Sequence, residues 1–150
     1  QISLDCFTTT SKSVHNMDSL AILLRAEQLV SHNFHNTTRG MAFFADHEFF
    51  GDVYPELEGD YDAVVERCIG SGEDINLCDV TTQAASKASA YDCSDMAADE
   101  MCAVLLGMER ALQAKCTELN KGASLGTQNL LQGIADKSEM RTYKLRQRIK

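Results

Sequence analysis

The sequence contains very little that would interrupt a helix. Its 150 residues include a single proline, Pro55, and nine glycines. Proline and glycine are the residues that most often end helices and mark the turns between short strands. Their scarcity favours a few long helices over many short strands. The first prediction is therefore an all-α fold.

Apolar residues recur every three or four positions along four segments, which is the spacing of one helix face. Helices are predicted over residues 11–38, 41–69, 80–120 and 124–148, with room for a short separate helix before the third. The residues expected to face inward are Val14, Met17, Ala21, Leu24, Leu29, Phe34, Phe43, Phe44, Phe50, Tyr54, Leu57, Tyr61, Val64, Val65, Ala97, Met101, Val104, Leu105, Met108, Leu112, Leu130, Leu131, Ile134, Met140, Tyr143 and Leu145.

Pro55 lies inside the second predicted helix, between Gly51 and Gly59. An interior proline removes one backbone hydrogen bond and usually kinks a helix, so we expect a bend or local bulge there. Long helices, short loops and one longer link in the middle are typical of a four-helix bundle with a crossover connection. The length is that of one domain, and we see no linker or internal repeat, so residues 1–150 are predicted to form a single domain.

The net charge of −8 disfavours some partners. An acidic body repels phosphate backbones, so DNA binding would need a local basic segment. The C-terminal stretch is the one candidate, and we expect it to be a solvated helix face that suits the negative end of a helix dipole. Its basic residues are Lys137, Arg141, Lys144, Arg146, Arg148 and Lys150. The longest apolar runs, such as Leu20–Leu24, are far too short to cross a bilayer, so no membrane partner is expected.

Six cysteines make an even number, which would suit a disulfide framework in a small secreted protein. They are Cys6, Cys68, Cys78, Cys93, Cys102 and Cys116. This chain is larger than such scaffolds and shows no secretory signal at its start, and no two cysteines form the CxxC pair of a zinc ribbon. We expect most of them to be small apolar residues on the helices of a cytoplasmic protein.

Histidines and acids on the first two predicted helices are the candidates for chemistry. His32 and His35 lie near the end of the first helix and His47 lies in the second, whereas His15 is expected at the surface. A site that mixes imidazole nitrogen with carboxylate oxygen suits Fe(II) or Zn(II), whereas carboxylates alone would suit calcium or magnesium.

Asp62 and Glu66 are four residues apart on the second predicted helix and so point the same way. On an exposed face they would be an ordinary solvated pair. In a buried position they would require a cation between them. The residues alone leave both interpretations open.

The stretch from Leu20 to Arg67 resembles the Dps family of mini-ferritins. That family has a histidine near the end of its first helix, an Arg-Gly step, a phenylalanine, a second histidine twelve residues after the first, and an Asp-x-x-x-Glu-Arg ending. The matching residues here are His35, Arg39, Gly40, Phe43, His47, Asp62, Glu66 and Arg67. The segment from Leu125 to Arg146 is similar to the final helix of the family.

The resemblance implies a ferritin-like four-helix bundle with a long crossover between helices two and three, assembled into a hollow dodecamer of two-fold pairs. It implies that His35 and His47 of one subunit face Asp62 and Glu66 of its neighbour. Iron(II) would bind there, be oxidised, typically by hydrogen peroxide, and be stored as ferric mineral. Such a ferroxidase protects a cell from oxidative damage, and zinc or manganese could use the same metal-binding residues.

A classical ferritin instead carries Glu-x-x-His motifs within one bundle. Here the residue three before His47 is Phe44, and the residue three before His35 is His32. The absence of that motif favours the intersubunit site.

Three departures from the family pattern affect this prediction. The acid expected one turn after the second histidine is Gly51, and Asp52 could replace it if the helix is distorted there. The tryptophan that often follows the first histidine is Asn36, so aromatic protection would fall to Phe or Tyr. The turn over residues 122–131 has no acid, which puts iron entry by that route in doubt.

Two other interpretations stay open. The first is a structural or DNA-associated shell with weak or no ferroxidase activity. The second is a monomeric bundle in which the four candidate residues are incidental.

Overall fold

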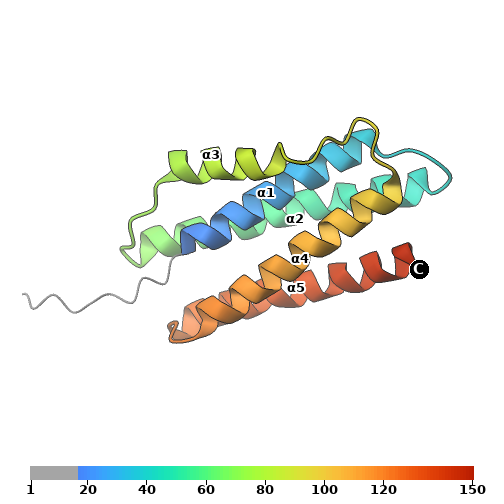
Figure 1. Cartoon of the computed structure of the whole chain (residues 1–150). Helices are drawn as coiled ribbons and strands as arrows, with labels where there is room; N and C mark the ends of the chain where they lie inside the picture. Colours follow the sequence, from blue (N-terminus) through green and yellow to red (C-terminus); the bar gives the residue numbers. More distant parts are fainter. Residues whose placement is uncertain (1–16) are drawn as a thin grey trace, which may run out of the picture.

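The computed structural model describes residues 17–150. Over this range it contains five helices and no strand: α1 (Met17–Thr37), α2 (Phe43–Gly70), α3 (Leu77–Ala88), α4 (Ala98–Asn120) and α5 (Leu125–Ile149). The four long helices run alongside one another, and short α3 lies along the outer side of α1 (Figure 1). The predicted all-α helical bundle is confirmed. Val14 and His15 lie outside the described residues.

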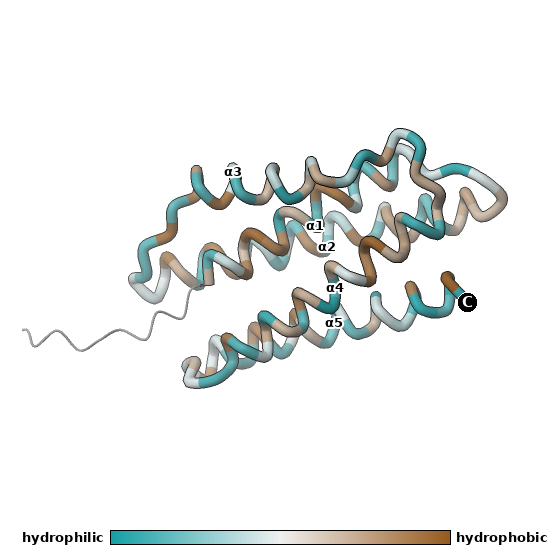
Figure 2. The backbone as a smooth tube through the Cα atoms, viewed as in Figure 1, coloured by the Kyte–Doolittle hydropathy of each residue, from teal (hydrophilic) through white to brown (hydrophobic). Residues whose placement is uncertain are grey.

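The long helices form two antiparallel hairpins. α1 packs on α2, and α4 packs on α5, while the two hairpins meet through α1 and α4 and, less extensively, through α2 and α5. The apolar stretches in Figure 2 follow the inner sides of these helices. Leu24, Leu57 and Leu112 lie in one cluster of the core, Phe34 and Met101 lie in the other, and all five are buried. None of the described helices combines the length and the apolar character needed to span a bilayer.

The prediction of one continuous helix over residues 80–120 is wrong. The segment consists of two helices, because the chain leaves helical geometry between α3 and α4. In that link the carboxylate of Asp92 accepts a hydrogen bond from the backbone N–H of Ser94 at 3.0 Å. Such a local turn offers the backbone an alternative to helix. A short separate helix is present, and it begins at Leu77, where the Asn76 side chain accepts from Asp79 N–H as an N-cap.

Most residues predicted to face inward are buried or half-buried. The exceptions among the described residues are Phe44, Ala97, Met140 and Tyr143, which are exposed. The error on α5 has a clear cause, because its buried face carries the polar residues Ser138, Arg141 and Thr142. A pattern that counts only apolar residues therefore pointed partly to the outer side of this helix.

The second helix is not broken at Pro55, and the bend expected there remains a prediction. α2 continues through this residue as an α-helix from Phe43 to Gly70. Val53 and Leu57, on either side of the proline, are buried in the same cluster as residues of α1. Packing on both sides of Pro55 thus holds the helix despite the missing hydrogen bond, since tertiary contacts can override local propensity.

The cysteines in the described residues are free thiols. Cys68, Cys102 and Cys116 are buried on α2 and α4, as expected for small apolar residues. Cys78 is exposed on α3, and Cys93 is half-buried in the link before α4. Cys6 lies outside the described residues.

Candidate metal half-site

His35 and His47 lie face to face where α1 turns into α2. Their ring centroids are 3.8 Å apart, and the ring planes differ by 23°. His35 is in the last turn of α1, and His47 is in the second turn of α2. The short connection between the helices includes Gly40, whose φ of +105° suits a residue without a side chain. The two predicted histidines are therefore brought together within one chain.

Each histidine is held by the backbone of the other. Nδ1 of His35 donates to the carbonyl of His47 at 2.8 Å, and Nδ1 of His47 donates to the carbonyl of His35, also at 2.8 Å. A carbonyl oxygen can only accept, so the hydrogen of each neutral ring lies on Nδ1. Nε2 of both rings is then left with a lone pair. Metal-binding histidines are typically fixed in this way, with the other ring nitrogen bound to a carbonyl or carboxylate.

Aromatic rings flank the histidine pair. Phe43 stacks on His47 with centroids 5.0 Å apart, and Tyr54 lies 5.6 Å from His35. Tyr54 also stacks on the exposed ring of His32 at 4.0 Å. Phe and Tyr rings therefore stand beside the pair in a chain that has no tryptophan, as the sequence predicted.

Gly51 makes room for the ring of His35. A Cβ atom on residue 51 would lie 3.0 Å from both Cε1 and Nδ1 of that ring, which is closer than real Cβ atoms normally come. An aspartate at this position would therefore require the ring of His35 to shift by a few tenths of an ångström. The sequence indicated only a missing ligand at Gly51, because the close approach depends on how two helices pack.

Asp62 and Glu66 lie apart from the histidine pair. Asp52, Asp62 and Glu66 are all exposed on α2. Asp62 follows His47 by fifteen residues of continuous helix, so the two are roughly 22 Å apart at 1.5 Å per residue. Residues 17–150 contain no group of three or more His, Cys, Asp and Glu side chains that could hold a metal ion. Within one chain, the candidate histidine ligands are thus separated from Asp62 and Glu66. A role for Asp52 as a ligand remains a prediction.

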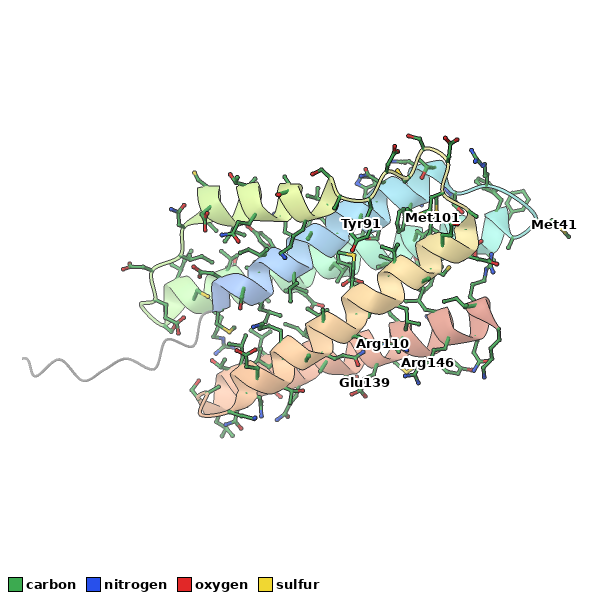
Figure 3. The ribbon with its side chains drawn as sticks, in the orientation of Figure 1. Met41, Tyr91, Met101, Arg110, Glu139 and Arg146 are labelled. Atoms are coloured by element: carbon green, nitrogen blue, oxygen red, sulfur yellow. The ribbon has the colours of Figure 1, made fainter. Side chains whose placement is uncertain are left out.

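The C-terminal basic residues do not form a single free face. Lys137 pairs with Asp60, Arg141 pairs with Glu109 and Glu56, and Arg148 pairs with Asp46 and Asp99. The other three basic residues of this stretch form no ion pair with a described residue. They are Lys144, Arg146 and Lys150. Arg146 lies on the outer side of α5 (Figure 3).

Comparison with known proteins gives one relevant similarity. No family model matches the sequence. The chain is 30% identical to the nutrient stress-induced DNA-binding protein of Synechococcus sp. (strain ATCC 27144 / PCC 6301 / SAUG 1402/1) in an alignment of 116 residues. This alignment covers 73% of the present chain and 64% of the relative, so the chain spans less than two thirds of the protein that it matches. The all-helical chain with its paired histidines is therefore similar in sequence to a protein named for nutrient stress and DNA binding.

Proposed function

We propose that the chain is a ferritin-like mini-ferritin of the Dps type, which binds Fe(II) between two copies of itself and oxidises it. The relative's name is of the Dps type, and the histidine and acid spacings resemble that family. The observation that carries the proposal is the reciprocal bonding of His35 and His47, which leaves both Nε2 atoms with free lone pairs.

The site would be completed by pairing two chains about a two-fold axis. His35 and His47 of one copy would then meet Asp62 and Glu66 of the other, and the same contact would repeat in reverse. Asp62 and Glu66 are exposed and therefore accessible to a second copy. Two imidazole nitrogens and two carboxylates are a donor set that suits Fe(II). The pairs would assemble into the hollow twelve-subunit shell that the resemblance implies.

In the proposed reaction iron is the substrate. Two Fe(II) ions each lose one electron, and hydrogen peroxide accepts both electrons together with two protons to form two water molecules. The Fe(III) ions are then stored inside the shell as mineral. The protein would fix the two imidazoles and the two carboxylates around the ion before the oxidant arrives, so little reorganisation is needed.

Complementation between two defective variants tests the intersubunit site. One variant carries His35→Ala and His47→Ala, and the other carries Asp62→Ala and Glu66→Ala. Each alone should oxidise Fe(II) no faster than buffer when ferric absorbance is followed after peroxide addition. Produced together in equal amounts, they should recover about a quarter of the wild-type sites, because half of the pairs are mixed and each mixed pair has one intact site.

The control is a variant with Asp136→Asn and Glu139→Gln, which removes two exposed acids from α5 and should oxidise iron normally. If the mixed protein stays inactive while its shell assembles, the site is not shared between subunits. If the single variants remain active, these residues do not bind iron. Metal analysis of the purified wild-type protein distinguishes iron from zinc or manganese.

A shell that associates with DNA and oxidises iron weakly is the second candidate. The relative's name and the absence of an acid at Gly51 favour it. Three basic residues at the C-terminal end form no ion pair with a described residue: Lys144, Arg146 and Lys150. A gel-shift assay in low salt, with the triple Ala variant as the comparison, tests this candidate, because phosphate contacts weaken steeply with salt.

A further inference from the structure

The interior of the bundle holds a polar cluster that the proposed iron site does not use. Each long helix contributes one residue to it: Glu27 from α1, Glu56 from α2, Glu109 from α4 and Arg141 from α5. Glu27 and Glu109 are each only 1% exposed, and Arg141 is 4% exposed. Charged side chains are almost never buried to this degree unless they are paired.

Arg141 and Glu109 form the central ion pair. The Nε and Nη2 atoms of Arg141 donate to the two carboxylate oxygens of Glu109, and Ser138 Oγ donates to Oε2 of the same carboxylate at 2.5 Å. The remaining Nη1 atom of Arg141 donates to Glu56 at 2.8 Å, and the Glu56 side chain is 39% exposed. The single buried positive charge is thus already shared by two acids.

Glu27 is the third acid and has no cation of its own. The carboxyl groups of Glu27 and Glu109 lie close enough to interact, while the Oε1 atom of Glu27 has no hydrogen-bond partner. Two carboxylates can share a hydrogen bond only when a proton lies between them. Burial and then the charge of Glu109 raise the pKa of Glu27 well above its ordinary value of 4.5, although Arg141 acts in the opposite direction. Burial and the neighbouring charge of Glu109 thus favour the protonated form of Glu27.

Other titratable groups lie around this cluster on the facing helices. They are Asp60 on α2, Cys116 on α4 and Lys137 on α5. Asp60 pairs with Lys137, and the cysteine is near both Asp60 and Glu109. The one cation among them, Lys137, pairs with Asp60, so none of these groups supplies a second positive charge to Glu27.

We propose that Glu27 and Glu109 share a single proton where the α1–α2 hairpin meets the α4–α5 hairpin, and that removal of this proton by base weakens the contact between the hairpins. The proton joins α1 directly to α4, one of the two helix pairs through which the hairpins meet (Figure 1). Without this proton, Glu27 and Glu109 would both be charged, and the charge of Glu27 would have no cation to balance it.

The consequence for stability follows from proton linkage. The folded chain holds a proton that the unfolded chain releases above about pH 4.5, the ordinary value for Glu27. The stability that this proton contributes is complete below that pH. It is lost as the pH rises to the raised pKa of Glu27 in the folded chain. Each pH unit in this window should lower the folding equilibrium constant about tenfold through Glu27 alone.

The test compares the full-length wild type with Glu27→Gln and with the exposed control Glu139→Gln on the outside of α5 (Figure 3). Denaturant unfolding is measured from about pH 6 to about pH 8 at one protein concentration, because assembly makes stability depend on concentration. Over the part of this range that lies below the raised pKa of folded Glu27, the folding constant of the wild type and of Glu139→Gln should fall about tenfold more per pH unit than that of Glu27→Gln. Parallel pH profiles for all three proteins would overturn the proposal.

If Glu27→Gln does not fold, infrared spectroscopy on the native wild type provides an independent result. A protonated carboxyl group has its own C=O stretching band, and this band should persist above about pH 4.5, the ordinary value for Glu27, and disappear on titration with base. The loss of the band should coincide with faster amide hydrogen exchange in α1 and α4. Absence of the band, or its loss without faster exchange, would refute the shared proton as a joint between the hairpins.

Discussion

Replacement of Gly51 by alanine separates helix stability from the geometry of the histidine pair. The new Cβ would lie 3.0 Å from two atoms of the His35 ring, so the ring must shift from its place against His47 by a few tenths of an ångström. Two hydrogen bonds from Nδ1 atoms to carbonyls would be broken or stretched, at a cost of about 1 kcal/mol each. In the opposite direction, alanine is favoured over glycine inside a helix by about 1 kcal/mol. The free energy of unfolding should therefore fall by about 1 kcal/mol.

Gly59→Ala is the matched control, because Gly59 lies on the same helix and a Cβ there meets nothing within 4 Å. This variant should gain about 1 kcal/mol, so the two alanine variants should differ by about 2 kcal/mol in denaturant unfolding. Nitrogen-15 NMR of the imidazoles should show Nδ1–H on both rings of the wild type and of Gly59→Ala, with altered signals in Gly51→Ala. Affinity for Fe(II) or a Co(II) probe should fall about 10–100-fold in Gly51→Ala only. Equal stability and unchanged imidazole signals in both variants would refute the argument.

Further predictions concern the acids of α2, the end of the bundle and the thiols. Asp62→Asn with Glu66→Gln should abolish metal binding yet change the free energy of unfolding by less than about 0.5 kcal/mol, since both side chains are exposed; loss of the shell on sedimentation would instead make them structural. Arg148→Met should cost about 2 kcal/mol in thermal unfolding, because it leaves the buried carboxylate of Asp46 unpaired, whereas exposed Arg146→Met should be neutral. With Cys6 replaced by serine, a thiol reagent near pH 8 should label Cys78 first. Burial raises the pKa of Cys68, Cys102 and Cys116 to about 11, so these three should react only on unfolding.

The end of the first helix and both ends of the second were predicted closely, because Gly40 lies between the two helices, whereas the predicted start of the first at residue 11 lies outside the described residues. The break after α3 was not predictable in the same way. Residues 84–90 are mostly alanine and serine, which gives no local reason to stop, and the helix ends where Asp92 forms its turn. Side-chain hydrogen bonds of this kind do not appear in a hydropathy pattern.

The pairing of His35 with His47 was expected from the resemblance to the Dps family, but the way in which the two rings are held was not predictable. Twelve residues separate His35 from His47 across one tight connection, so helix geometry alone brings them near each other. Their reciprocal hydrogen bonds depend on ring positions that only packing determines. The buried cluster was missed for another reason. Periodicity assigns charged residues to the surface, whereas Glu27, Glu109 and Arg141 stabilise one another in the interior.

The unbroken course of α2 through Pro55 has a further consequence for an assembly of paired chains. In the proposed site, this helix would carry the histidine ligand His47 near one end and the carboxylate ligands roughly 22 Å further on. In the proposed two-fold pair, two antiparallel copies of α2 would set the separation between imidazoles and carboxylates at both iron positions. Inserting one residue between His47 and Asp62 would turn the acids by roughly 100° relative to the imidazoles and disable both positions together.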